Sequence, residues 1–201
     1  HLTRVAADFA SLAAEPTVRL PQTRPSMRNH WQARFLTSVP LSGSAPEHYF
    51  RLPSWPTCRW RWLEFDHPDG YGWYGAFEEG EIEGWTEVVP VSETDDEFVV
   101  LSAGAPYWIS AGTHRLHYPV LSQRVSKVLA VPEHALVVAG EDTEVLVLSQ
   151  SGLAFRESIA HDFVRLTEAR GAEVFGIAEG CEISPDRSFV INAISHAVRW
   201  L

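Results

Sequence analysis

Twelve carboxylates and no lysine or arginine lie between Trp62 and His114, a segment that we call the acidic window. The window carries a formal charge of −12, which exceeds the −10 of the whole chain, so the remaining residues sum to +2. Ten of the 23 aromatic residues fall in the same window. Carboxylates mixed with aromatic rings favour a basic protein or a sugar as the partner, and they repel nucleic acid and anionic membranes.

Alternate residues of a strand share one face, so Glu79, Glu81 and Glu83 are expected together on a solvent-exposed face. Their mutual repulsion requires a positive neighbour, which is either the chain's own Arg59 and Arg61 or a bound partner. The alternative is a solvated strand face with aromatic rings packed beneath it. The predicted partner-binding residues are Trp73, Tyr74, Glu78, Glu79, Glu81, Glu83, Trp85, Glu87, Asp95 and Asp96.

This pattern predicts a non-enzymatic binding protein with a basic protein partner, for example an immunity or inhibitor protein against a toxin. Such proteins use fixed carboxylates to speed association and a buried aromatic side chain as an anchor. One alternative is a carbohydrate-binding module or a carbohydrate-acting hydrolase, in which Trp73, Tyr74 or Trp85 stacks on a sugar ring. A third is a self-associating structural subunit whose acidic window meets the arginine-rich N-terminal arm of a neighbouring copy.

No residue pattern predicts a catalytic, metal or cofactor site, and we lean against an enzyme. His114 and His117 form the one close pair of histidines, but on a strand their rings would point to opposite faces. The segment Ser149–Gly152 follows a β-run but lacks the first glycine of a nucleophile elbow. The glycine-rich motifs that bind phosphates do not occur in the sequence.

The two cysteines, Cys58 and Cys181, are too few for a disulfide framework. We expect buried structural thiols and leave their pairing open. No run of 18 apolar residues occurs, so no membrane-spanning helix is expected. The N-terminal residues lack the pattern of a secretory signal, which slightly favours a cytoplasmic location while leaving the compartment undetermined.

The chain divides at residue 30. Apolar residues at helical spacing predict a short helix over 1–14, and a Pro/Arg-rich arm follows to residue 30. Residues 31–201 predict one β-rich domain, an antiparallel sandwich or a curled meander, with a subdivision near 118–122 as the alternative. Strands are expected at 32–38, 48–52, 57–66, 71–77, 82–91, 97–102, 106–110, 113–118, 134–139, 143–149, 153–157, 173–178, 188–192 and 196–200.

Some segments carry more specific signals. The turn His67–Gly70 should join two strands of a hairpin, and Pro90 should mark an edge strand or a bulge. The apolar spacing at 121–131 predicts a short helix, whereas 158–170 fits both a helix and a strand, of which we favour the strand. Residues 134–200 show the succession of short strands and turns that is typical of a propeller blade. No internal repeat is evident, however, and a complete propeller does not fit alongside residues 1–130.

Overall fold

The computed structural model describes residues 31–54, 56–92, 96–180 and 185–201. These residues form sixteen strands in four four-stranded sheets, with one 3₁₀ turn, η1, at Pro132–His134. The prediction of a mainly β fold is confirmed. The predicted N-terminal helix and Pro/Arg-rich arm, residues 1–30, lie outside the described residues.

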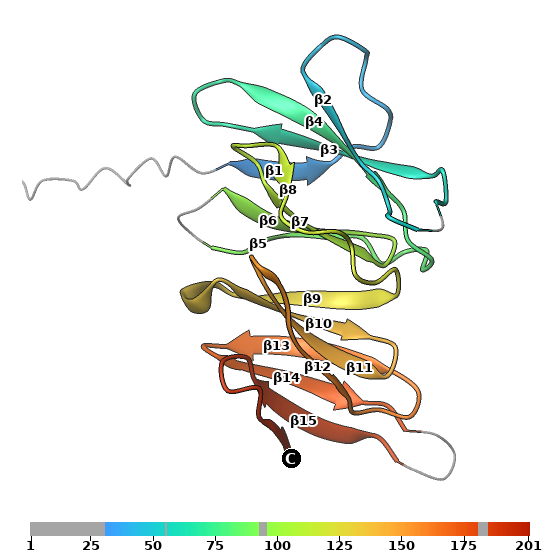
Figure 1. The fold of residues 1–201 in the computed structure, drawn as a ribbon, viewed down its shortest axis with the longest axis vertical. Coiled ribbons are helices and arrows are strands. Elements are labelled where there is room, and N and C mark those ends of the chain that lie inside the picture. The colour runs from blue at the N-terminus through green and yellow to red at the C-terminus, as the bar shows by residue number, and fades with distance from the viewer. Residues whose placement is uncertain (1–30, 55, 93–95, 181–184) are drawn as a thin grey trace, which may run out of the picture.

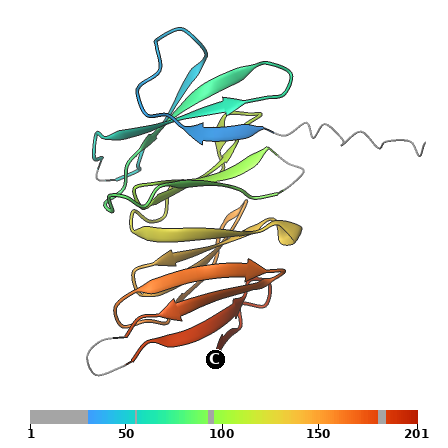
Figure 2. The ribbon, with the colours of Figure 1, turned by 180° about the vertical axis from the view of Figure 1, so that it is seen from behind.

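The four sheets are stacked one on another along the longest axis of the molecule (Figures 1 and 2). Each sheet uses one continuous portion of the chain, so the order of the sheets in the stack follows the order of the sequence. Sheet A contains β1 (Gln32–Phe35), β2 (Glu47–Phe50), β3 (Trp60–Asp66) and β4 (Gly72–Glu78). Sheet B contains β5 (Glu87–Pro90), β6 (Glu97–Ser102), β7 (Ala105–Ser110) and β8 (Arg115–Leu116). Sheet C contains β9 (Val125–Val131), β10 (Leu136–Glu141), β11 (Glu144–Ser149) and β12 (Gly152–Ser158). Sheet D contains β13 (Val164–Arg170), β14 (Glu173–Ala178), β15 (Arg187–Asn192) and β16 (Val198–Trp200).

Sheets B, C and D are antiparallel meanders in which each strand pairs with the next one in sequence. Sheet A differs, since its order is β1-β3-β4-β2 and β2 runs parallel to β4. The first strands of successive sheets contact one another, β1 with β5, β5 with β9 and β9 with β13. Four-stranded sheets adjoining through their first strands resemble propeller blades. Sheets B, C and D therefore repeat one four-stranded topology, which no repeat in the sequence predicted.

Three apolar clusters lie between the sheets. Aromatic rings dominate the cluster between sheets A and B, where Phe65 stacks on Trp73 at a centroid distance of 4.2 Å. Trp108 and aliphatic side chains fill the space between sheets B and C, and valines with Phe189 fill that between C and D. The subdivision considered near 118–122 falls in the connection between β8 and β9. Sheets B and C, which this connection joins, share the buried cluster that contains Trp108.

The predicted hairpin is confirmed as β3 and β4. Its turn is closed by the His67 N–H, which donates to the Tyr71 carbonyl at 2.9 Å, and Gly70 adopts a φ of +85°. Pro90 is the last residue of β5, which pairs only with β6 and is therefore an edge strand, as predicted. The strand favoured within 158–170 is also confirmed, as β13.

Two other predictions are wrong. The helix expected at 121–131 is strand β9, which is covered by sheet B on one side and sheet D on the other. The strand expected at 82–91 shortens to β5, and residues 79–86 form an irregular connection between sheets A and B. Glu79, Glu81 and Glu83 therefore do not share a strand face.

Candidate functional site

Three of the predicted partner-binding residues are buried. Trp73 is 1% exposed, and its indole N–H donates to the Ala111 carbonyl at 2.9 Å. Glu78 is also 1% exposed, and its carboxylate accepts the backbone N–H groups of Leu52 at 3.0 Å and Cys58 at 2.9 Å. Burying a carboxylate is costly unless hydrogen bonds replace its hydration, and here two backbone donors do so. Glu78 thereby positions the segment between β2 and β3, and Trp73 is held by the residue that follows β7. Both side chains are closed to a partner.

Glu79 is buried and neutralised within the chain. Its two carboxylate oxygens meet the Nε atoms of Arg59 at 3.3 Å and Arg61 at 2.6 Å. The positive neighbour that the sequence required for this carboxylate is thus the chain's own pair of arginines. The acidic window contains no basic residue of its own. Arg59 and Arg61, which immediately precede it in the sequence, supply positive charge that compensates Glu79.

Glu87, Asp96 and Trp85 are half-buried and make contacts inside the molecule. Glu87 accepts the backbone N–H of Val128 at 2.9 Å and pairs with Lys127, which ties sheet B to sheet C. Asp96 accepts the Ser110 hydroxyl at 3.0 Å and the Gly112 N–H at 2.7 Å. The Trp85 ring packs against Phe163 with centroids 5.0 Å apart. Asp95 lies outside the described residues.

Tyr74, Glu81 and Glu83 are the predicted residues that stay accessible. Glu81 and Glu83 are exposed in the connection between β4 and β5. Tyr74 is half-buried on β4, opposite Glu64 and Glu47 of the two neighbouring strands. The sequence-predicted set is therefore not one continuous surface, but Tyr74 belongs to a cluster that the prediction only partly found.

That cluster occupies the outer face of sheet A, the face turned away from sheet B. Strand alternation sends Leu63 and Phe65 inward to the core and their neighbours Trp62 and Glu64 outward. The Tyr49 ring meets the Trp60 and Trp62 rings edge-on, at centroid distances of 5.7 and 5.5 Å. We call the set Tyr49, Trp60, Trp62 and Tyr74 the ring face.

The ring face lies at one end of the stack, where no other sheet of the described chain packs over it (Figure 1). Tyr49 is 54% exposed, and the other three rings are half-buried. The alternation of Trp60 and Trp62 in the sequence is a signal for such a face. The ring face was not predicted because Tyr49 comes from a separate strand, and only the pairing of both strands with β4 brings its ring to Trp62.

Charges of both signs border the ring face. Arg34 of β1 pairs with Glu64, and the Arg51 guanidinium lies 5.6 Å from the centre of the Trp60 ring. The Tyr49 hydroxyl donates to Glu47 at 3.0 Å, and this hydrogen bond raises the pKa of Tyr49. Asp66, at the end of β3, is exposed. Aromatic rings with arginine and carboxylates at the border are the composition of protein-binding surfaces.

The histidines do not form a metal site in the part of the chain that is described. His48 and His114 have ring centroids 4.4 Å apart, and His114 lies 4.9 Å from Trp73. Burial, and then the nearby His48, lower the pKa of His114. His117 instead contacts Glu97 at 2.6 Å, a carboxylate whose pKa is raised mainly by burial. Among the residues described, no group of three or more His, Cys, Asp or Glu side chains is placed to hold a metal ion.

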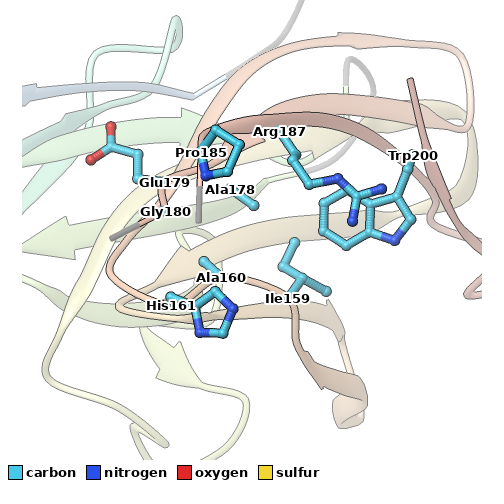
Figure 3. A pocket seen from close by; sticks show the side chains of 9 residues that line it. All are labelled: Ile159, Ala160, His161, Ala178, Glu179, Gly180, Pro185, Arg187 and Trp200. Atoms are coloured by element: carbon cyan, nitrogen blue, oxygen red, sulfur yellow. The ribbon is translucent and has the colours of Figure 1, made fainter. Parts of the chain in front are cut away.

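A pocket of about 180 Å³ lies at the opposite end of the stack, between the β12–β13 connection and the end of sheet D (Figure 3). The Arg187 guanidinium covers the Trp200 ring at 4.3 Å from its centre. Glu179 points away from this stacked pair and is 3.4 Å from the Nε of Arg165. His161 and Ile159 complete the near wall, and the mixture of charges selects no ligand class.

The remaining candidate for chemistry is a thiol. Cys58 is exposed with a φ of +56°, so the expectation of a buried structural thiol is wrong for this residue. Cys181, its possible partner, lies outside the described residues. Ser149 ends β11, and its hydroxyl lies 2.9 Å from that of Ser151 in the turn to β12.

Comparison with known proteins gives no family. No family model matches the chain, and neither does any curated protein. Among solved structures, a chain of the "Crystal Structure of Mitotic Checkpoint Complex" is similar at 14% identity, over 98% of this chain and 74% of that chain, with a TM-score of 0.39. A likeness this weak carries no argument about function. The described portion of the chain also contains no helix with the length and apolar character needed to cross a membrane.

Proposed function

We propose that this chain is a non-enzymatic binding protein that recognises a basic protein partner through the ring face of sheet A. The observation that carries the proposal is the gathering of Tyr49, Trp60, Trp62 and Tyr74 on the outer face of an end sheet. Stacked-sheet proteins with no further partner usually carry polar side chains on their terminal faces. Tyrosine and tryptophan are also the residues that most often dominate binding energy at protein interfaces.

Charge supports the choice of a basic partner. The net charge is −10, and Asp66, Glu81 and Glu83 are exposed carboxylates. A field of this sign accelerates the approach of a cationic protein and weakens as salt is added. An immunity or inhibitor protein against a basic toxin is the specific form that we propose, with the rings as anchor and the carboxylates as steering groups.

The carbohydrate-binding and self-association alternatives depend on different residues. The carbohydrate-binding alternative relied on Trp73, Tyr74 or Trp85. Trp73 is buried and Trp85 packs against Phe163, so Tyr74 is the one of the three that lies on the ring face. The self-association alternative relies on residues 1–30, which carry four arginines and two carboxylates. Removing these residues and measuring the mass in solution by light scattering tests it, since a change from oligomer to monomer is required.

The proposal is tested by capturing partners from the source cell's lysate and then measuring the affinity of the purified partner. The variants Tyr49→Ala and Trp62→Ala should each weaken binding by about tenfold or more, because truncating an anchor ring typically costs over 1 kcal/mol. Trp200→Ala is the matched control, since Trp200 is an exposed tryptophan of sheet D at the far end of the stack. Thermal unfolding of each variant confirms that it is folded.

Two results would contradict the proposal. The first is a partner whose affinity is unchanged by Tyr49→Ala and Trp62→Ala while both variants stay folded. The second is a partner that is acidic, or whose association rate rises with salt concentration. An association rate that falls steeply with salt, together with loss of binding in the ring-face variants, supports it.

A further inference from the structure

Two histidines meet where the edge of sheet A contacts sheet B. His48 is the second residue of β2, His114 lies in the turn between β7 and β8, and their ring centroids are 4.4 Å apart. Both rings also contact the uncharged ring of Trp73 on β4, at centroid distances of 5.3 and 4.9 Å. Strand alternation sends His48 and Phe50 into the molecule, whereas Tyr49 between them points outward to the ring face. We call His48 and His114 the histidine pair.

The surroundings of the histidine pair favour neutral rings. In the described chain, ion pairs between histidine and a carboxylate form at other histidines. Asp96 accepts a backbone N–H of the turn and the hydroxyl at the end of β7. Glu47 lies on the outer face of β2 and accepts a tyrosine hydroxyl, and Arg115 at the start of β8 is exposed. Burial first, and then the nearness of His48, lower the pKa of His114.

β2 is held to the molecule on one side only. It is a four-residue strand at the edge of sheet A and pairs with β4 alone among the described strands. Of its inward side chains, Phe50 stacks on Phe77 at a centroid distance of 4.7 Å, and His48 meets His114. Tyr49, the next residue, is the most exposed ring of the ring face and meets both of its tryptophans. A displacement of His48 therefore moves Tyr49 as well, because one peptide bond joins them.

We infer that the histidine pair is an acid-sensitive switch, in which proton uptake by both rings separates β2 from sheet B and withdraws Tyr49 from the ring face. Two positive rings at this distance repel each other, and the repulsion is strong because water is partly excluded from the half-buried site. The Trp73 ring attracts a cation, which favours the first proton but does not cancel the repulsion that the second one meets. Histidine titrates close to neutral pH, so mild acid is sufficient.

The switch regulates the proposed binding surface. The lowered pKa of His114 keeps this residue neutral at pH 7, where β2 is closed and the ring face is complete. As pH falls through that pKa, the ring face loses Tyr49 as an anchor and the partner is released. The release of the partner rests on the proposed function, whereas the movement of β2 does not.

The test is histidine NMR and amide hydrogen exchange on the full-length protein between pH 7.5 and pH 5.0. The protection factors of the hydrogen-bonded amides of β2 should fall by about tenfold or more, because lowering one pKa by one unit shifts the coupled equilibrium by that factor. The ring protons of His48 and His114 should titrate over the same interval. Amides of β7 and β10 should keep their protection, which separates opening of β2 from unfolding of the whole chain.

Three variants make the result specific. His114→Asn and His48→Asn each remove one ring of the pair, and asparagine tolerates the φ of +57° at position 114. In either variant the fall in β2 protection should shrink to less than about twofold. His134→Asn is the matched control and should retain the full fall, since His134 is an exposed histidine of η1, outside sheets A and B. Thermal unfolding at pH 7.5 shows whether each variant is folded.

The inference is overturned if β2 keeps its protection at pH 5.0, or if β7 and β10 lose theirs over the same interval. It is also overturned if both pair variants stay folded and retain the full fall. With the purified partner, the wild type should bind about tenfold or more weakly at pH 5.5 than at pH 7.5, and His114→Asn should lose less. An equal loss in both proteins would overturn the regulation of partner binding.

Failure of the proposed function gives a different result. If β2 opens in acid while Tyr49→Ala and Trp62→Ala leave partner affinity unchanged, the switch stands and the ring face is removed as the binding surface. If the partner depends on the ring face while β2 stays closed at pH 5.0, only the switch is removed.

Discussion

Glu78 illustrates how a carboxylate of the acidic window serves the fold rather than a partner. Its two oxygens accept backbone N–H groups from Leu52 and Cys58, and its own carbonyl accepts the Tyr107 hydroxyl at 2.7 Å. Glu79, Glu87 and Asp96 are held in comparable ways by arginines, a lysine and backbone donors. At the scale of single residues, much of the window's negative charge is therefore balanced inside the molecule.

We predict that Glu78→Ala destabilises the protein by about 2–5 kcal/mol, because it leaves the buried N–H of Leu52 and the partly buried N–H of Cys58 without acceptors. Urea unfolding followed by tryptophan fluorescence measures the change in the free energy of unfolding. Glu83→Ala removes an exposed carboxylate from the neighbouring connection and should change stability by less than about 0.5 kcal/mol. Equal effects of the two substitutions would contradict the role given to Glu78.

His114 gives a prediction about pH. Burial and the nearby His48 lower its pKa below the ordinary 6.5, so the unfolded chain takes up a proton more readily than the folded one. Stability contributed by neutral His114 is present above pH 6.5 and is lost as pH falls through the lowered pKa. His114→Asn should therefore lose less stability than the wild type between pH 7 and pH 5, as measured by thermal unfolding. Asparagine is chosen because position 114 has a φ of +57°.

The candidate site was only partly predictable at this scale. Counting charges located the acidic window, and Tyr74, Glu81 and Glu83 are accessible as expected. The count cannot supply the donors that each carboxylate meets, since these come from residues distant in the sequence. The two donors to Glu78 are 26 and 20 positions away. The ring face required pairing Tyr49 with Trp62 across separate strands, which no local pattern contains.

At the scale of elements, β9 shows why the spacing of apolar residues alone does not distinguish a strand from a helix. Its buried residues are Val125, Val128 and Val131, three apart, which imitates the spacing of a helix. The cause is its position, because β9 contacts strands of both sheet B and sheet D, and its register with β10 shifts between Gly140 and Glu141. A strand covered on both faces and interrupted by a bulge loses the alternation that identifies strands.

The crossing from sheet A to sheet B gives an element-level prediction. A Cβ on Gly80 would lie 2.6 Å from the Ala103 carbonyl oxygen and 2.8 Å from both the Ala105 nitrogen and the Gln123 oxygen. All three are backbone atoms that cannot move aside, so Gly80→Ala should destabilise the protein by about 1–3 kcal/mol or more. Chemical denaturation measures the loss. Ser151→Ala in the exposed β11–β12 turn is the control, and a neutral Gly80→Ala would show that the two sheets are not held this closely.

At the scale of the whole molecule, sheets B and C are the most enclosed parts of the stack. Every residue of β7 is buried, whereas most residues of β12 and β16 are exposed. Amide exchange followed by mass spectrometry should therefore be slowest in β6, β7, β10 and β11 and faster by orders of magnitude in β12 and β16. Uniform exchange across all four sheets would contradict this gradient and indicate a single cooperative unit.

The mainly β class could be predicted because short apolar runs bounded by turn residues recur throughout residues 31–201. The repeated topology of sheets B, C and D could not be predicted, since the three sheets share a strand order without sharing residues. Sheet A places a parallel strand beside β4 and packs with aromatic rings, whereas sheets C and D pack largely with valines. Stacking depends on the shape and apolar character of each face, and many sequences satisfy that requirement.

The order of the sheets along the stack has a consequence for how the protein is made. A ribosome releases the chain from its N-terminus, so each four-stranded unit is finished before the next one emerges. In sheets B, C and D every strand finds its partner in the segment just synthesised, which keeps the entropy lost in closing loops small. In sheet A, β1 must wait for β3, and β2 must wait for β4. Sheet A is thus expected to close more slowly during synthesis than sheets B, C and D, each of which should add to a sheet that is already in place.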